Sequence, residues 1–190
     1  MPYDPPPELA SLTMLEIAER VAARKLPPIE QWDPPHSGDS FMRIDSQGQW
    51  FHKGEPIRRP AMVRLFATIL RREADGSFAL VTPFEKQAIM VEDAPLVAVE
   101  FTASGTGRDL QIAFRLNTDE LVIAGPGHPL HFVTRKGEQL PYVTYRPGID
   151  ARIGRNIYYD LVELALAGDG EETGLWSNGA WFAFPDGDDQ

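Results

Sequence analysis

A strand, a Lys-Gly-Glu turn and a return strand occur twice in this chain, and a helical pattern follows each of them. Residues 50–57 read WFHKGEPI and residues 131–140 read HFVTRKGEQL. In both places an Asp-Gly turn and an apolar strand come after the helix, at residues 75–82 and 169–184. Supersecondary units that recur in one order predict two similar halves. Chance recurrence of common turn residues is the alternative, because identity between the halves is sparse.

Most of the remaining chain has the period of β-strands. From Leu110 to Leu116, apolar and polar residues alternate, which is typical of a strand with one buried face. The expected strands are residues 41–45, 49–52, 77–82, 86–91, 96–101, 110–116 and 119–124. We therefore predict an α+β fold with two similar halves, each a small, mostly antiparallel sheet packed with one helix, plus an N-terminal helix.

Three helices are expected from apolar residues at helical spacing. The first spans residues 8–25 and is stopped by two prolines. The second begins at Pro60, a residue suited to the first turn, and continues to about Arg72. The third begins at about Asp150, a good N-cap, and continues to Ala167.

These elements divide the chain into three parts. Residues 1–37 hold the N-terminal helix and a proline-rich linker, residues 38–117 form the first half, and residues 118–190 form the second half with an acidic tail. The boundary between the halves is expected near residues 116–120. The N-terminal helix is interpreted as packing on its own domain, and the alternative is an arm that binds a partner.

Charge and composition narrow the functional classes. The formal net charge is -10, which argues against general nucleic-acid binding and against an anionic membrane surface. The chain has no cysteine, so disulfides and thiolate chemistry are excluded. The N-terminus does not resemble a signal peptide, and no apolar run is long enough to span a membrane, so we expect a cytoplasmic protein.

Several sequence blocks in a fixed order resemble a bacterial family, the domain of unknown function 1285 family. These blocks are GDSFMRI at 38–44, GQWF at 48–51, VRLF at 63–66, LVTPFEK at 80–86, VEDAP at 91–95 and YYDLVEL at 158–164. The resemblance covers residues 27–185, and Ser40-Phe41 departs from a more usual Ile-Asp. It implies a two-part α+β fold with a cleft between the parts, a nucleotide-like ligand and a signalling role.

Arginine is clustered where the second helix is expected. Residues 58–72 contain five of the chain's 18 Lys and Arg residues: Arg58, Arg59, Arg64, Arg71 and Arg72. The third expected helix carries Arg152, Arg155 and Tyr159 on its polar side, near the end that favours anions. If the halves are related by an approximate twofold axis, these two faces would meet and bind phosphate or carboxylate oxygens. The alternative is ordinary ion pairing with nearby carboxylates.

Other candidate residues carry weaker signals. Glu85 and Lys86 follow a strand end, a frequent ligand position, although a proline-set turn is the simpler interpretation. Tyr159 is the preferred aromatic residue for stacking on a base. The four histidines lack the spacing of a metal site, and no phosphate-binding, dinucleotide-binding or hydrolase motif is present. We therefore expect no catalytic residue, no metal and no cofactor.

Three functional hypotheses follow in order of preference. The first is a non-catalytic, regulatory binder of a small anionic ligand in the cleft between the halves, with Arg58, Arg64, Glu85, Lys86, Arg152, Arg155 and Tyr159 as candidate contacts. The second is a protein-interaction or dimerisation module, in which exposed strand edges and the N-terminal helix contact a protein partner or a second copy. The third is an enzyme that uses Glu85, Asp93 or His52.

Overall fold

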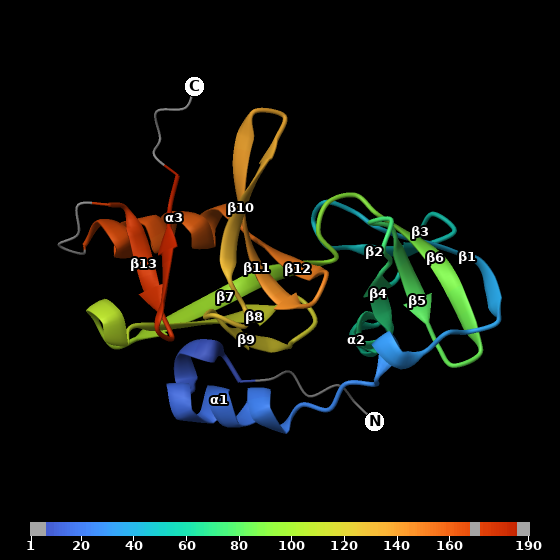
Figure 1. Ribbon diagram of the computed structural model, residues 1–190, viewed down its shortest axis with the longest axis horizontal. Coiled ribbons are helices and arrows are strands. Elements are labelled where there is room, and N and C mark those ends of the chain that lie inside the picture. The colour runs from blue at the N-terminus through green and yellow to red at the C-terminus, as the bar shows by residue number, and fades with distance from the viewer. Residues whose placement is uncertain (1–6, 168–171, 186–190) are drawn as a thin grey trace.

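The structure is a computed structural model that describes residues 7–167 and 172–185. It contains two six-stranded sheets, one in each half of the molecule (Figure 1). Neighbouring strands are antiparallel, except for one central parallel pair in each sheet. Each half also contributes one helix that packs on the common core. The expected α+β fold with two similar halves is confirmed.

The first sheet has the strand order β3-β2-β1-β6-β5-β4. Its strands are β1 (His36–Ile44), β2 (Trp50–His52), β3 (Glu55–Pro56), β4 (Leu70–Arg72), β5 (Phe78–Val81) and β6 (Glu85–Val91). Helix α2 (Pro60–Thr68) connects β3 to β4. In Figure 1, α2 and β4 lie on the side of this sheet that faces the second half.

The second sheet has the order β10-β11-β12-β7-β8-β9. Its strands are β7 (Leu96–Ser104), β8 (Gln111–Leu116), β9 (Leu121–Ile123), β10 (Leu130–Arg135), β11 (Glu138–Arg146) and β12 (Ile149–Ile153), with the short helix η3 (Gly107–Asp109) between β7 and β8. Helix α3 (Arg155–Leu166) follows, and a hairpin of β13 (Gly174–Ser177) and β14 (Ala180–Ala183) packs beside it.

The two sheets have the same topology. Each consists of two three-stranded meanders, joined by parallel pairing of the first strand of the half with its sixth strand. The first strand is β1 in one half and β7 in the other, and the sixth strands are β6 and β12. The internal repeat is therefore present, but its equivalences differ from the predicted ones. Hairpin β10–β11 occupies the place of β4–β5, whereas the sequence comparison matched it with β2–β3.

The division between the halves lies earlier than expected. Strands β7 and β8 pair with the second sheet, although the expected boundary near residues 116–120 assigned them to the first half. The connection between the sheets is the short segment from Val91 to Leu96. Strand pairing across long sequence separations determines this boundary, and local sequence patterns do not report it.

Helix α2 is shorter than predicted. It begins at Pro60 as expected but ends at Thr68, and residues 70–72 form strand β4. Leu70 is fully buried and pairs with Leu80 of β5, so tertiary pairing overrides the helical period there. Arg71 and Arg72 were expected on this helix with Arg64, and they lie on β4 instead. The helix packs through Phe66, whose ring stacks on Trp50 with centroids 6.2 Å apart.

Helix α3 begins later than predicted, because the preceding residues form strand β12. Ile149, Ala151 and Ile153 are buried and alternate with the half-buried Asp150 and Arg152, which is the period of a strand. Asp150 is therefore not the N-cap of the helix, and Arg152 does not lie on it. Gly154 is the N-cap residue.

One continuous hydrophobic core extends through both halves. Ile44, Trp50 and Leu70 of the first half belong to the same cluster of buried residues as Phe114 and Ile149 of the second half. Because apolar contacts are shared across the junction, the two halves stabilise each other.

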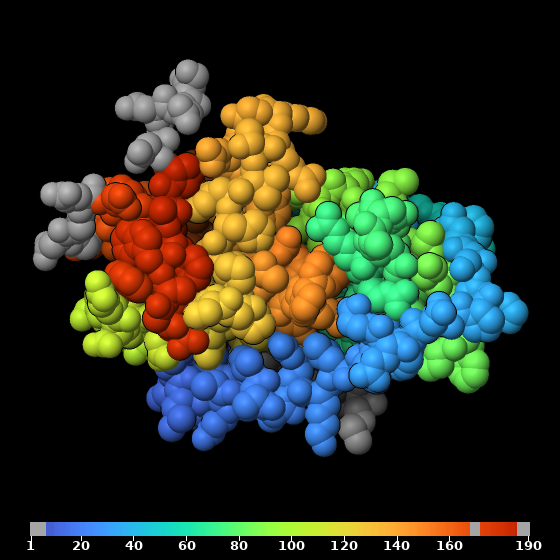
Figure 2. All heavy atoms as spheres, viewed as in Figure 1, coloured from blue at the N-terminus to red at the C-terminus, as the bar shows by residue number. Residues whose placement is uncertain are grey.

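The N-terminal segment packs on the second half through a small core of its own. Helix α1 (Met14–Ala23) begins with a capping box formed by Thr13 and Glu16 and follows the short helix η1 (Leu9–Ser11), so the regular helix is shorter than the expected residues 8–25. Its fully buried Ile17 contacts a satellite cluster that is completed by residues of β8 and β9. Figure 2 shows this segment in blue along one side of the body.

The linker after α1 is fixed to the first sheet. A short helix, η2 (Ile29–Gln31), lies beside β4. The Arg71 guanidinium donates to the carbonyl oxygens of Ile29 at 2.9 Å and Trp32 at 2.8 Å. Trp32 itself is half-buried. The acidic tail at 186–190 lies outside the described residues. No helix among the described residues is long and apolar enough to cross a membrane.

Candidate functional site

The seven predicted contact residues do not gather in one site. Arg64 pairs with Asp119 at 2.7 Å, while Arg152 lies 3.4 Å from Asp93 in another part of the junction. Arg155 is the first residue of α3 and pairs with Glu138 at 3.3 Å, with 70% of its side chain exposed. The expected meeting of two arginine faces across a twofold axis is therefore not observed.

The other predicted contacts lie on the surface or in local pairs. Tyr159 is 57% exposed on α3, and Arg58 is exposed in the loop between β3 and α2. Lys86 binds Glu73 at 3.0 Å, and Glu85 accepts a hydrogen bond from Gln87. Of the seven residues, Arg64 alone lines a cavity between the halves.

A cavity of about 260 Å³ lies between α2 of the first half and the second sheet. Apolar side chains form much of its wall, and Arg64, Thr68, Thr118, Glu120 and Tyr145 supply polar groups. Ligand sites commonly combine apolar walls with a few polar groups in this way. The cavity lies where the fold brings one side of α2 against the turn between β8 and β9.

Arg64 is held in place by the turn between β8 and β9. Its Nη1 lies 2.7 Å from Oδ2 of Asp119, and the other oxygen of that carboxylate lies 3.4 Å from Nη1 of Arg115. Arg115 in turn binds Glu100 at 2.6 Å, and the opposite oxygen of Glu100 accepts the backbone N–H of Leu9 at 2.7 Å. One chain of charged groups therefore connects α2, the second sheet and the N-terminal segment.

Tyr145 supplies a buried hydroxyl to the cavity. Its side chain is 3% exposed, and burial together with the neighbouring Glu120 carboxylate raises the pKa of the hydroxyl to about 12. The hydroxyl is therefore protonated at neutral pH. The Arg24 guanidinium lies over the ring at 4.6 Å from its centroid.

Thr118 is the second buried hydroxyl in the cavity wall. The residue is 2% exposed, and its Oγ1 has no hydrogen-bond partner among the described residues. A buried polar group without a partner is uncommon in folded proteins and costs stability. Such costs are concentrated at sites with a function beyond folding.

Arg146 closes the end of α2 from the other half of the molecule. Its guanidinium donates to the carbonyl oxygens of Ala67, Thr68 and Leu70 at 2.8, 3.3 and 2.5 Å. The carbonyls of Ala67 and Thr68 lie at the end of a helix, where a cation is favourable, and Leu70 begins the strand that follows. Burial lowers the pKa of Arg146 from its ordinary high value. This contact fixes the helix that forms one wall of the cavity.

A second polar cluster surrounds Asp93, in the connection between the sheets. Only 6% of its side chain is exposed. Its carboxylate accepts a hydrogen bond from the Tyr142 hydroxyl at 2.7 Å and pairs with Arg135 at 3.1 Å and Arg152 at 3.4 Å. Burial and the Asp93 hydrogen bond raise the pKa of Tyr142 to about 12. Because Asp93 is enclosed by its own partners, we interpret this cluster as a structural contact that stabilises the junction between the two halves.

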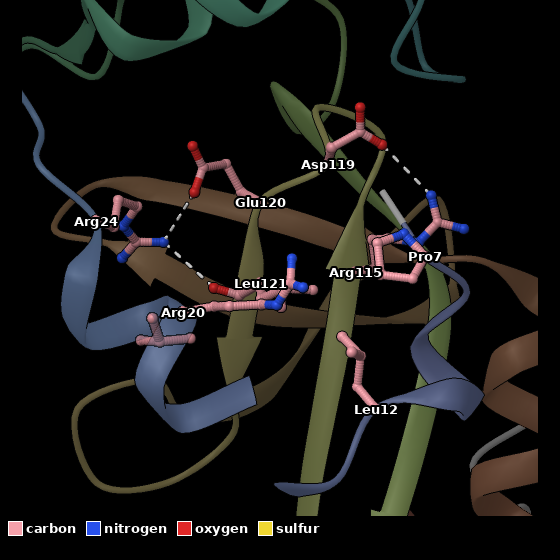
Figure 3. A pocket seen from close by; sticks show the side chains of 9 residues that line it. Pro7, Leu12, Arg20, Arg24, Arg115, Asp119, Glu120 and Leu121 are labelled. Carbon is pink, nitrogen blue, oxygen red and sulfur yellow. Dashed lines mark hydrogen bonds and ion pairs between the residues drawn. The ribbon is translucent and has the colours of Figure 1, made fainter. Parts of the chain in front are cut away.

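A smaller pocket of about 120 Å³ lies between α1 and the β8–β9 region. Figure 3 shows Arg20 of α1 and Arg24, the residue that follows the helix, around it, together with Arg115, Asp119 and Glu120 of the second half. Arg24 binds Glu120 at 3.3 Å and the carbonyl oxygen of Leu121 at 3.2 Å. Glu120 lines both this pocket and the interdomain cavity.

The sequence interpretation missed most of the cavity residues. Thr118 and Glu120 belong to a stretch that was interpreted as a domain boundary and the start of a strand, and Tyr145 and Arg146 lie at the end of β11, where no strand was predicted between residues 141 and 149. The signal that was available is the run of aromatic and β-branched residues from Tyr142 to Tyr145, which is typical of a strand, before a Pro-Gly turn. In the described part of the chain, no cluster of three or more His, Asp or Glu side chains is arranged to hold a metal ion.

Two sheets of one topology, a shared core and a cavity at their junction define a two-domain α+β protein with an interdomain pocket. The comparisons with known proteins place it more narrowly. Residues 27–94 match the N-terminal domain of the domain of unknown function DUF1285, and residues 95–184 match the C-terminal domain of the protein of unknown function DUF1285. The chain belongs to the DUF1285 family, as the sequence resemblance indicated.

Two solved structures of DUF1285 family proteins are similar to this chain. One, from Silicibacter pomeroyi DSS-3, is 42% identical with a TM-score of 0.77, over 90% of this chain and 93% of that chain. The other, from Shewanella baltica OS155, is 26% identical with a TM-score of 0.51, over 66% of this chain and 92% of that chain. Among curated proteins, none matches the chain.

Proposed function

We infer that this protein is a non-catalytic binder of a small anionic ligand, with the ligand in the cavity between α2 and the second sheet. The observation that carries this inference is the arrangement of Arg64, Thr118 and Tyr145 around an apolar-walled cavity of about 260 Å³. The guanidinium would bind a carboxylate or phosphate oxygen, and the two hydroxyls would bind further oxygens of the ligand.

The size of the cavity restricts the ligand. At about 30 Å³ for each water, the cavity has room for roughly nine waters. A small organic acid with a short apolar body fits within such a volume, whereas a whole nucleotide would extend into solvent. We therefore place small carboxylic acids and phosphate monoesters first and keep nucleotides as the comparison class.

A regulatory role follows from the position of the cavity. Arg64 and Thr68 come from the first half, whereas Thr118, Glu120 and Tyr145 come from the second. A ligand that contacts both sides favours the arrangement of the halves in which both sets of contacts are made. Occupancy would therefore change the relation of the two halves, and a partner protein would respond to that change.

Thermal unfolding against a panel of small acids, phosphate esters and nucleotides tests this inference. A ligand that binds only the folded protein adds about 2.7 kcal/mol at 100 times its Kd, which is a readily measured shift. Arg64→Gln should remove most of the shift, while Arg155→Gln, which changes an exposed arginine outside the cavity, should keep it. Equal shifts for the two variants, or no shift across the panel, would contradict the inference.

An interaction module is the second candidate function, and one surface favours it. Phe41 is 62% exposed and Met90 is 63% exposed, and both line an open groove on the first sheet. Phe41 also has a φ of 53°, which is strained for an aromatic residue. Sedimentation of the protein across micromolar concentrations, compared with Phe41→Ser, tests this candidate. A monomer in both cases would count against self-association through this groove.

A further inference from the structure

The pocket between α1 and the second sheet differs in chemistry from the interdomain cavity. It is lined by three arginines, Arg20, Arg24 and Arg115, and by two carboxylates, Asp119 and Glu120. The arginines of the lining outnumber its carboxylates by one, although Glu100, outside the lining, pairs with Arg115 at 2.6 Å, and the net charge of the chain is -10. The pocket is therefore much less negative than the protein on average, which favours an anion there over the rest of the surface.

Hydrogen-bond donors exceed acceptors in this pocket. Each guanidinium has five N–H donors and no acceptor. Arg24 uses Nη1 for Glu120 and the Leu121 carbonyl, while Arg115 is directed to Glu100 and Asp119. No hydrogen bond or ion pair engages the exposed Arg20 guanidinium within the described part of the chain, and its charge contributes to the lowered pKa of Glu16 one turn earlier. Arg20 and the second Nη of Arg24 therefore have donors for a further acceptor.

The pocket depends on a segment that lies outside the family's two domains. The matches to the DUF1285 domains begin at residue 27, whereas Pro7, Leu12, Arg20, Val21 and Arg24 precede it. The buried Ile17 and the capping box at Thr13 fix this segment against β8 and β9. A chain that consists of the two family domains alone would have only the Arg115 side of the pocket.

We propose that this pocket is a binding site for one small oxyanion, a carboxylate or a phosphate, which is built by the N-terminal segment and is separate from the interdomain cavity. Its volume of about 120 Å³ corresponds to roughly four waters, so the occupant has the size of acetate or inorganic phosphate. Arg20 and Arg24 bind the oxyanion from the α1 side, and Arg115 lines the pocket from β8, with its guanidinium directed to Asp119 (Figure 3).

Anion-dependent unfolding and calorimetric titration of the full chain test the proposal. Inorganic phosphate and acetate are the probes, and chloride at equal ionic strength controls for general screening. We expect at least one of the two oxyanions to raise the Tm and chloride to have no such effect. A response to acetate alone assigns the site to carboxylates, and a response to phosphate alone assigns it to phosphates.

Point variants test whether the oxyanion binds in this pocket while α1 stays in place. Arg20→Gln should weaken oxyanion binding roughly tenfold, the cost of about 1.4 kcal/mol expected for one charge-assisted contact. Arg59→Gln, which changes an exposed arginine before α2, should leave the affinity unchanged. Equal affinity of the two variants, or a response to the oxyanions no larger than that to chloride, would overturn the proposal.

One further variant separates this site from the interdomain cavity. Ala61 is exposed and lines only the interdomain cavity of the two, so Ala61→Phe narrows that cavity alone. Oxyanion binding that survives Ala61→Phe and is weakened by Arg20→Gln supports two separate sites. Loss of oxyanion binding in Ala61→Phe would place the oxyanion in the interdomain cavity and overturn the assignment.

Discussion

The Arg146 Nη2 atom lies 2.8 Å from the carbonyl oxygen of Ala67, a residue of the other half of the molecule. The same guanidinium also reaches the carbonyls of Thr68 and Leu70, so one side chain of the second half satisfies the end of α2. Such a contact joins the two halves by hydrogen bonds as well as by apolar packing.

Removal of this guanidinium should destabilise the protein. Arg146→Met keeps much of the side-chain volume but leaves several carbonyls at the end of α2 without a donor, which costs about 2–4 kcal/mol in the free energy of unfolding. Urea denaturation measures this cost. Arg155→Met is the matched control, since an exposed ion pair contributes about 0–1 kcal/mol. Similar losses in both variants would show that the helix end does not depend on Arg146.

A substitution in the shared core should cause a larger loss in the free energy of unfolding. Phe114 is fully buried in the second sheet, where Phe101 contacts it with ring centroids 6.3 Å apart. Phe114→Ala should cost about 3–5 kcal/mol, because it leaves a cavity that the surrounding core cannot fill. Phe84→Ala changes a residue that is 75% exposed and should stay within about 0.5 kcal/mol of the parent protein. A single unfolding transition in both variants would confirm that the halves unfold together.

The pair of His131 and Asp150 predicts a pH dependence of stability. The Asp150 hydrogen bond raises the pKa of His131 above its ordinary value, against the opposing effect of burial. The charged pair therefore contributes stability that is fully present below about pH 6.5 and is lost as the pH rises through the raised pKa. His131→Gln should remove this contribution.

Urea denaturation of the parent and His131→Gln proteins between about pH 5.5 and pH 8.5 measures this effect. The difference in unfolding free energy should be largest at the acidic end and should decrease toward the alkaline end. The pKa of Asp150 is lowered, since hydrogen bonds from His131 and Thr144 outweigh its burial, so Asp150 stays charged across this range. A difference that is constant with pH, or that grows with it, would contradict the assignment.

Weakening the N-terminal helix should lower stability locally and leave the rest of the protein unchanged. Thr13→Ala removes the capping box, which costs about 0.5–2 kcal/mol of helix stability. Because α1 packs on a satellite core apart from the main one, amide exchange should accelerate in residues 14–23 while β7 and β8 stay protected. Thr82→Ala, in the turn between β5 and β6, is the control. Faster exchange throughout the second sheet would indicate that α1 belongs to the main cooperative unit.

Local patterns predicted many of the strands and the start of α2. The alternation at residues 110–116 and the proline at position 60 are local sequence signals, and the structure has β8 and the start of α2 at these positions. The end of α2 and the start of α3 could not be predicted in this way. Leu70 pairs with Leu80, and Ala151 pairs with Leu96 across 55 positions, and such pairing has no local signature.

The candidate site was predictable only in part, for the same reason. Arg64 was identified because arginines cluster around it in the sequence. Thr118, Glu120 and Tyr145 have ordinary sequence contexts and become a site only when the second sheet brings the β8–β9 turn beside β11 and α2. Arg152 was predicted to lie on the third helix. It lies on β12 and pairs with Asp93.

The parallel pairing at the centre of each sheet affects how the chain is completed during synthesis. In each half the first strand to leave the ribosome, β1 or β7, lies beside the last strand of that half, β6 or β12. The first meander of each half can form early, because its contacts are local. Its central strand, β1 or β7, gains its second partner only after residue 91 in the first half or residue 153 in the second has emerged. During synthesis there are therefore two separate intervals, and in each of them the central edge of one unfinished sheet is exposed to chaperones or to a neighbouring chain.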